Sequence, residues 1–99
     1  MPYKILLHPL AETEFSEAQD WYEERLEGLG VRFEEKIEHH LQILKRTPLL
    51  FPKKRKNFRE VKVNTFPYVI VYKILEKRKV VLILSFHHTS RNPKNKYSR

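Results

Sequence analysis

The stretch VVLILSFHHTSRNP, residues 80–93, decides the fold of this chain. Its first part, Val80–Phe86, is apolar on both faces, which is typical of a central strand in a sheet. This strand brings two histidines, two hydroxyls and an arginine to one end of the sheet. Acid–base groups and a fixed cation on a rigid strand are what a phosphate-handling site needs, although the same groups also suit a simple binding surface.

Two further strands are predicted directly upstream. Residues 76–79 form a polar turn, and Tyr68–Leu75 before it alternates between two faces with a period of two. Phe58–Thr65 alternates in the same way, and Phe66-Pro67 separates it from the next strand. The three segments predict an antiparallel meander, which a loop at 49–57 with a basic second half precedes.

The first half of the chain predicts a strand and two helices. Residues 3–8 suit a short strand, and a proline follows it. Apolar residues then recur at three- and four-residue steps in 10–29 and again in 31–46, which is the period of an amphipathic helix. Gly28 and Gly30 mark a tight turn between the two helices, so we expect an antiparallel helical hairpin.

The predicted fold is therefore α+β, in the order strand, helix, helix, strand, strand, strand, with the helices packed on one face of the sheet. We expect one domain over residues 1–99, with a basic and flexible tail at 92–99. The other sheet face is rich in tyrosine and aliphatic residues, so we expect a partner or substrate to cover part of it.

The charge of the chain is divided unevenly. Its formal net charge is +8. Residues 1–47 hold 6 Lys/Arg and 10 Asp/Glu, whereas residues 48–99 hold 14 Lys/Arg and only 2 Asp/Glu. A domain with this distribution has a strong positive field on part of its surface, which favours a polyanionic partner such as nucleic acid or an acidic protein segment.

Cysteine is absent, which excludes disulfides and thiolate metal sites and fits a reducing cytoplasm. No apolar run approaches the roughly 20 residues of a membrane span. His39 and His40 lie about 100° apart on a helix, so they cannot bind one metal in the i, i+4 manner. We expect no metal, no cofactor and no membrane association.

Several motifs occur in a characteristic order along nearly the whole chain. They are Leu7-His8-Pro9 followed by Ala11 and Glu14, Trp21-Tyr22, Phe33, Phe58-Arg59-Glu60-Val61, Phe66-Pro67-Tyr68-Val69-Ile70-Val71-Tyr72 and His88-Thr89-Ser90-Arg91-Asn92-Pro93. In this order the sequence resembles the RelE/ParE toxin superfamily of bacterial type II toxin–antitoxin systems, which includes proteins called plasmid stabilisation factors. The resemblance implies a cytoplasmic toxin neutralised by a cognate antitoxin, as a homodimer or in a heterotetramer with it.

The resemblance leaves the target open. RelE-like members are ribosome-dependent endonucleases that cut mRNA without a metal, whereas ParE-like members poison DNA gyrase and have no established hydrolytic site. The histidine and arginine at the chain end, together with Arg59, slightly favour the endonuclease. The absence of a second arginine between Tyr68 and Leu75 weighs against an efficient nuclease. A non-toxic nucleic-acid-binding module is the third hypothesis.

The resemblance to RelE-like nucleases also assigns candidate residues. RNA cleavage without a metal needs a base, an acid and cations that stabilise the charged phosphorane. The candidate catalytic residues are Arg59, His88, Arg91 and Tyr97. The candidate RNA- or phosphate-binding residues are Lys53, Lys54, Arg55, Lys56 and Lys94.

Each assignment has a structural alternative. Arg91 would pair with an antitoxin carboxylate, and His88 would be a strand-end residue bonded to the backbone. The run Lys53–Lys56 would be an electrostatic contact or a solvated loop, and Tyr97 would belong to a flexible tail. Neighbouring side chains of a strand point to opposite faces, so at most one of His87 and His88 faces the site.

Overall fold

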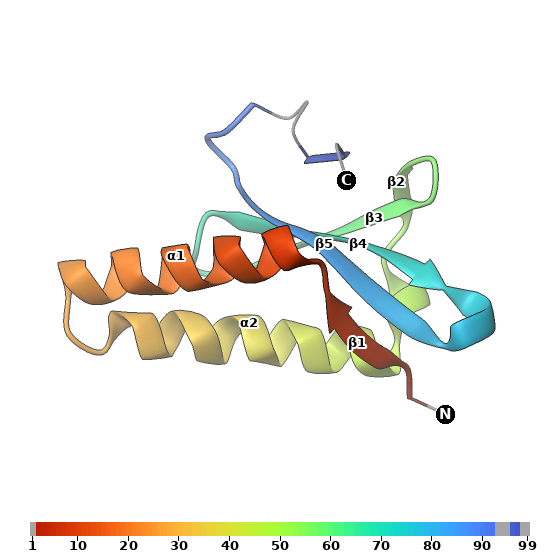
Figure 1. Cartoon of the computed structure of the whole chain (residues 1–99), viewed down its shortest axis with the longest axis horizontal. Coiled ribbons are helices and arrows are strands. Elements are labelled where there is room, and N and C mark those ends of the chain that lie inside the picture. The colour runs from red at the N-terminus through yellow and green to blue at the C-terminus, as the bar shows by residue number, and fades with distance from the viewer. Residues whose placement is uncertain (1, 93–95, 98–99) are drawn as a thin grey trace.

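The computed structural model describes residues 2–92 and 96–97 (Figure 1). Two helices lie side by side over one face of a five-stranded sheet, so the predicted α+β fold is confirmed. The elements in chain order are β1 (Lys4–Leu7), α1 (Pro9–Arg25), α2 (Leu29–Arg46), η1 (Pro48–Leu50), β2 (Lys53–Arg55), β3 (Phe58–Lys62), β4 (Tyr68–Leu75), η2 (Glu76–Arg78) and β5 (Val80–His88).

The sheet has the order β1-β5-β4-β3-β2. β1 runs parallel to β5, and the remaining neighbours are antiparallel. The predicted meander corresponds to β3, β4 and β5. The predicted loop at 49–57 is more ordered than expected, because it contains the 3-10 turn η1 and the short edge strand β2.

A bulge in β5 changes the direction of its side chains. Tyr72 pairs with Ile83 and Val71 pairs with Ser85, which leaves Leu84 as the extra residue. Ile83 before the bulge and Phe86 after it both belong to the core under the helices. Strict alternation from Ile83 would have turned Phe86 to the other face, so the bulge shifts the second half of β5 by one residue.

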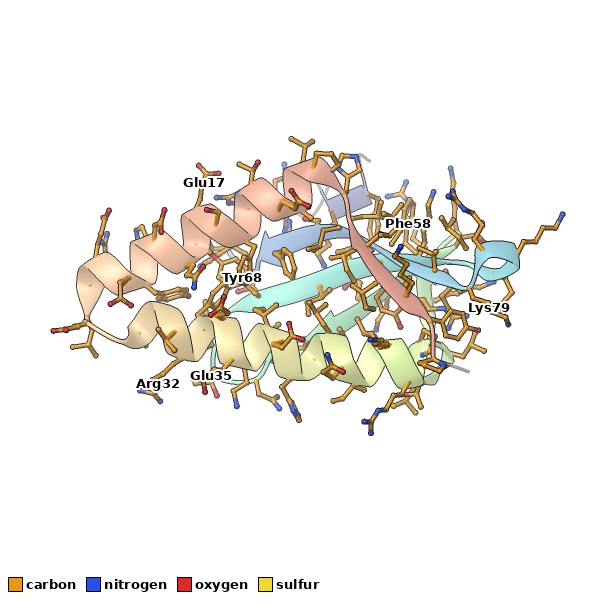
Figure 2. All side chains as sticks on the ribbon, turned by 60° about the horizontal axis from the view of Figure 1, so that its bottom comes forward. Glu17, Arg32, Glu35, Phe58, Tyr68 and Lys79 are labelled. Carbon is orange, nitrogen blue, oxygen red and sulfur yellow. The ribbon has the colours of Figure 1, made fainter. Side chains whose placement is uncertain are left out.

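Aromatic rings fill the core between the helical hairpin and the sheet (Figure 2). Phe33 of α2 is fully buried and lies 5.2 Å from Tyr22, 5.2 Å from Phe66 and 5.4 Å from Tyr68 between ring centroids. Phe15 of α1 stacks on Phe33 at 5.7 Å. These offset and edge-on contacts stabilise the core beyond simple area burial and fix α1 and α2 against the sheet.

The turn between the helices depends on both glycines. Gly28 has a φ of +88°, a left-handed conformation that other residues rarely adopt. A Cβ on Gly30 would lie 2.8 Å from the carbonyl oxygen of Gln19, so the helices approach closely there. Glu23 accepts hydrogen bonds from the N–H groups of both glycines at 2.9 Å and caps α2.

The uneven charge along the sequence becomes an uneven charge in space. The register places the β2–β3 turn and the β4–β5 turn at the same end of the sheet. Both turns are rich in lysine and arginine, and Lys79 marks one of them in Figure 2. Glutamates such as Glu17 and Glu35 line the exposed faces of α1 and α2. In the described part of the chain, no helix has the length and apolar character needed to span a membrane.

Candidate functional site

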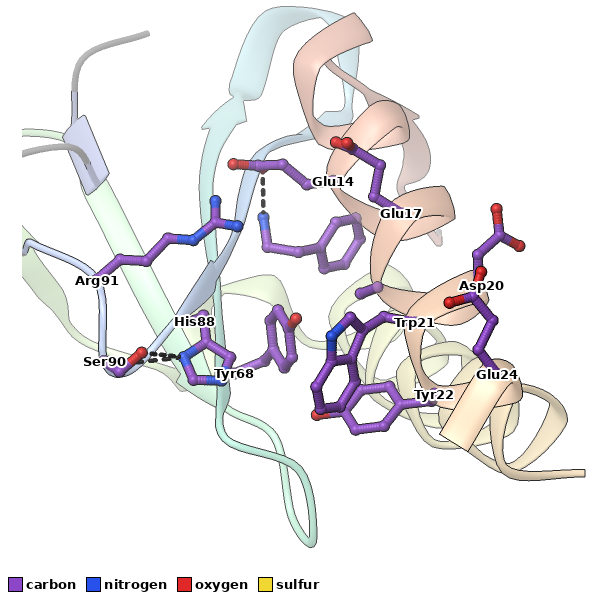
Figure 3. A pocket seen from close by; sticks show the side chains of 12 residues that line it. Glu14, Glu17, Asp20, Trp21, Tyr22, Glu24, Tyr68, His88, Ser90 and Arg91 are labelled. Atoms are coloured by element: carbon purple, nitrogen blue, oxygen red, sulfur yellow. Dashed lines mark hydrogen bonds between the residues drawn. The ribbon is translucent and has the colours of Figure 1, made fainter. Parts of the chain in front are cut away.

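A pocket of about 620 Å³ lies between α1 and the end of β5 with the loop that follows it. Figure 3 shows carboxylates of α1 on one wall and the end of β5 with the following loop on the other. The lining residues are Glu14, Glu17, Ala18, Asp20, Trp21, Tyr22, Glu24, Tyr68, Phe86, His88, Ser90 and Arg91.

Glu14 holds the two walls together. β1 ends at Leu7, opposite Ile83, so β1 does not pair with the second half of β5. There the Glu14 carboxylate accepts hydrogen bonds from the backbone N–H of Phe86 at 3.0 Å and from the Ser85 hydroxyl at 3.2 Å. The side chain of a helix residue thus satisfies a strand edge that would otherwise be unpaired.

His88 faces the pocket, and its orientation follows from the bulge. Its ring packs edge-on against Tyr68 at 5.1 Å, and its Nδ1 accepts the backbone N–H of Ser90 at 3.1 Å. The Ser90 hydroxyl lies 2.7 Å from the same nitrogen. Since a backbone N–H only donates, Nδ1 acts as an acceptor. The neutral ring therefore carries its proton on Nε2, which can donate a hydrogen bond.

The pocket walls carry opposite charges. Glu17, Asp20 and Glu24 are exposed along α1, and Arg91 is exposed on the opposite wall (Figure 3). Trp21 is 49% exposed beside them, which is unusual for a large aromatic residue. The pocket therefore suits a ligand that carries both charges and an apolar group.

Two aromatic residues that line this pocket, Trp21 and Tyr68, interact with nearby arginines. The guanidinium of Arg25 lies 3.8 Å from the centroid of the Trp21 ring, a cation–π contact on the outer side of α1. Burial raises the pKa of the Tyr68 hydroxyl above its usual value, and the nearby charge of Arg91 partly offsets this rise. Tyr68 is thus a neutral hydrogen-bonding group near neutral pH.

His87 occupies a different environment from His88. It pairs with Val69, lies on the face away from the helices and is 3% exposed. Burial lowers the pKa of its imidazole, and a hydrogen bond with the backbone of Arg91 partly opposes this effect. Among the described residues, none supplies a hydrogen-bond partner for its Nε2. The two histidines therefore do not share a site.

Arg59 lies away from the pocket. It sits on the helix-facing side of β3, where its Nη1 donates to the backbone oxygen of Phe51 at 2.5 Å. Its cross-strand neighbour Tyr72 donates to the backbone oxygen of Pro48 at 2.7 Å. Arg59 and Tyr72 thus hold the two ends of η1.

Tyr97 lies on the opposite face of β3. Its hydroxyl donates to Glu60, and its ring lies 5.2 Å from that of Phe58. Burial and the hydrogen bond to Glu60 raise the pKa of Tyr97 to about 12. Lys96 also pairs with Glu60 at 3.3 Å, so these two residues of the predicted flexible tail contact the sheet.

The candidate phosphate-binding residues form an exposed basic hairpin. Lys53, Lys54 and Arg55 make up β2, and Lys56 follows in the turn with a φ of +50°. The hairpin shares no residue with the pocket. Lys94 lies outside the described residues.

The structure thus brings two of the four candidate catalytic residues together. His88 and Arg91 line one pocket, whereas Arg59 holds the η1 turn and Tyr97 contacts Glu60 on the other face. Their roles in catalysis stay predictions. No group of three or more metal-ligating side chains occurs in residues 2–92 and 96–97.

Sequence reasoning missed Glu14 and Glu60, each of which organises its neighbourhood. Glu14 is one of the residues on which the family resemblance rests, but residue spacing does not distinguish it from the other carboxylates of 10–29. Glu60 is one of only two carboxylates in residues 48–99, which was the available signal that it pairs with a cation or hydroxyl. The spacing of apolar residues in 10–29 predicts Trp21 in the core, but its side chain is 49% exposed at the pocket.

Comparison with known proteins identifies relatives of this chain. Residues 5–93 match the family model described as the ParE toxin of the type II toxin–antitoxin system parDE. A search of curated protein sequences finds no match.

Solved structures share the fold. The chromosomal ParDE system of P. aeruginosa matches with a TM-score of 0.74 and 14% identity, over 89% of this chain and 97% of that one. The RelBE2 complex of Mycobacterium tuberculosis matches with a TM-score of 0.64 and 17% identity, over 89% and 99%. The E. coli RelBE complex matches with a TM-score of 0.60 and 20% identity, over 90% and 99%.

Proposed function

This chain belongs to the ParE toxin family of type II toxin–antitoxin systems, and from this premise we propose that it arrests growth by binding and poisoning DNA gyrase. A cognate antitoxin is its natural partner. The similar structures from P. aeruginosa, M. tuberculosis and E. coli are toxin–antitoxin systems or complexes, which supports this partner.

The candidate catalytic residues are divided among separate places in the fold, and this separation favours a binding poison over a nuclease. RNA cleavage requires a base, an acid and cations around one phosphate. Here Arg59 donates a hydrogen bond to the backbone oxygen of Phe51, and Tyr97 donates one to the Glu60 carboxylate on the other sheet face. Only His88 and Arg91 share a pocket, and three exposed carboxylates of α1 line its other wall. Those carboxylates would repel an approaching phosphate.

A ribosome-dependent mRNA endonuclease is the second candidate function. It is favoured by the pocket that His88 and Arg91 share, because the Nε2–H of His88 and the guanidinium of Arg91 could both donate hydrogen bonds to a phosphate. The exposed cations of β2 would then contact RNA. A non-toxic nucleic-acid-binding module is the remaining alternative.

Induced expression in bacteria separates these functions. Wild type is compared with Arg91→Ala and with the control Arg32→Ala, which removes an exposed arginine from α2. Gyrase–DNA adducts and lost negative supercoiling that precede any fall in translation support the proposal. A prompt translation block that Arg91→Ala abolishes would replace it with the endonuclease. The absence of a growth defect at every expression level would leave the non-toxic module.

A further inference from the structure

The η1 turn exposes two adjacent leucines. Leu49 is 60% exposed and Leu50 is 66% exposed, whereas Pro48 beside them is buried. Among the described residues, Leu26 at 61% is the only other large apolar side chain exposed to this degree. Isolated exposed leucines are common, but two consecutive ones in a tight turn form a contiguous apolar surface.

Side chains of β3 and β4 anchor the backbone of this turn. Tyr72 donates to the backbone oxygen of Pro48 at 2.7 Å, and Arg59 donates to that of Phe51 at 2.5 Å. Arg59 and Tyr72 are cross-strand neighbours on β3 and β4, so both anchors come from one place in the sheet. The backbone N–H of Leu50 also donates to Thr47 at 3.1 Å. A surface fixed before binding loses little conformational entropy when a partner docks.

Cations surround the two leucines on both sides in the sequence. Lys45 and Arg46 end α2, and Lys53 and Lys54 begin β2. No Asp or Glu occurs between residues 39 and 59. We name Leu49 and Leu50, with these four cations, the Leu49–Leu50 patch. It shares no residue with the pocket beside α1.

We propose that the Leu49–Leu50 patch is a docking surface for an acidic protein partner that offers an apolar recess to the two leucines. This inference rests on the proposed function, and it identifies the partner as the protein target of the toxin. A phosphate backbone would use the cations but would gain nothing from the leucine methyl groups. A protein interface buries apolar side chains at its centre and places charges at its rim, and this segment offers both exposed leucines and neighbouring cations.

The leucines and the cations make different contributions. Burial of two leucine side chains changes affinity by roughly tenfold or more for each residue, mainly through slower dissociation. The cations attract an acidic surface from a distance, so they mainly accelerate association and act less at high salt. Substitutions in the two groups therefore have separable kinetic effects.

Two pairs of full-length variants test this inference. Leu49→Ser/Leu50→Ser removes the apolar centre, and its control Leu26→Ser removes a leucine of equal exposure from the end of α1. Lys53→Glu/Lys54→Glu reverses two cations of the patch, and Lys77→Glu/Arg78→Glu makes the same change on the other hairpin. All of these side chains are exposed, and thermal unfolding verifies that each variant folds.

Binding of each protein is measured to purified gyrase, to the antitoxin, to a DNA duplex and to anionic lipid vesicles, beside growth arrest on induction. We expect Leu49→Ser/Leu50→Ser to weaken gyrase binding at least tenfold and to relieve arrest, while Leu26→Ser changes neither. Lys53→Glu/Lys54→Glu should slow association more than Lys77→Glu/Arg78→Glu does. Equal effects within either pair would overturn the inference, as would unchanged gyrase binding with lost binding to antitoxin, duplex or vesicles.

The same measurements separate this inference from the proposed function. A wild-type protein that arrests growth without binding gyrase would overturn gyrase as the target. The patch would still be supported if Leu49→Ser/Leu50→Ser relieved that arrest and Leu26→Ser did not, and arrest unaffected by the patch variant would overturn it. Neither arrest nor gyrase binding in the wild type would overturn both.

Discussion

Glu14 accepts the backbone N–H of Phe86 at 3.0 Å, and this contact joins α1 to the part of β5 that β1 does not reach. The contact lies directly beside the bulge at Leu84. A bulge weakens the local ladder and leaves backbone groups in need of partners. The carboxylate therefore stabilises the conformation of β5 that turns His88 toward the pocket.

The first prediction concerns this carboxylate. Glu14→Ala leaves the Phe86 N–H without its acceptor, so we expect the free energy of unfolding to fall by about 1–3 kcal/mol. Glu14→Gln keeps an acceptor oxygen and should cost less. Glu17 lies about one helical turn after Glu14 and is exposed, so Glu17→Ala should change stability by no more than about 0.5 kcal/mol. Urea denaturation measures all three, and equal losses for Glu14→Ala and Glu17→Ala would refute the role of Glu14.

The bulge also explains why the sequence does not predict which of His87 and His88 faces the pocket. Periodicity located the helices, the meander and the alternation in β4, because each depends on local residue spacing. Which histidine faces α1 depends on a one-residue shift at Leu84, and no residue spacing encodes that shift. Alternation from Ile83 would have placed His87 in the pocket, whereas His88 occupies it.

The candidate site was harder to predict than the fold for a related reason. Periodicity placed Arg59 on the same strand face as the core residue Val61, and the structure agrees. Its acceptor, the backbone oxygen of Phe51, belongs to a loop whose path depends on tertiary contacts. The contact of Tyr97 with Glu60 joins residues 37 positions apart, which no local pattern predicts.

The second prediction concerns the hydrogen bond of Arg59. Arg59→Ala removes a charge-assisted bond to a backbone oxygen, so we expect a loss of about 1.5–3 kcal/mol of stability. The η1 turn should also become more accessible to proteolysis, since one of its two anchors is lost. Lys62→Ala, an exposed cation on the same strand, serves as the control. Unchanged cleavage between residues 47 and 57 would contradict the anchoring role.

The third prediction concerns alkaline pH. Burial raises the pKa of Tyr72 to about 12 in the folded protein, against 10.0 for an exposed tyrosine. Between pH 10 and 12 the unfolded chain loses this proton and the folded protein keeps it, so stability falls as pH rises. Tyr72→Phe should be less stable at pH 7, because the Pro48 oxygen loses its donor, and should lose stability less steeply above pH 10. Parallel slopes for the two proteins would refute the assignment to Tyr72.

The fourth prediction concerns mildly acidic pH and the buried His87. Its pKa is lowered by burial, so below about pH 6.5 the unfolded chain binds a proton that the folded protein resists. This contribution to stability is therefore present above pH 6.5 and is lost as the pH falls. His87→Leu removes the titrating group and should flatten the fall of unfolding free energy between pH 7 and 5.

The control for this measurement is His39→Leu, which removes an exposed histidine from α2. Carboxylates also titrate at the lower end of this range, so the quantity to compare is the difference in slope between each variant and wild type. Urea denaturation at half-unit intervals of pH measures that difference. A His87→Leu slope equal to that of His39→Leu would show that His87 is protonated as readily in the folded protein as in the unfolded chain.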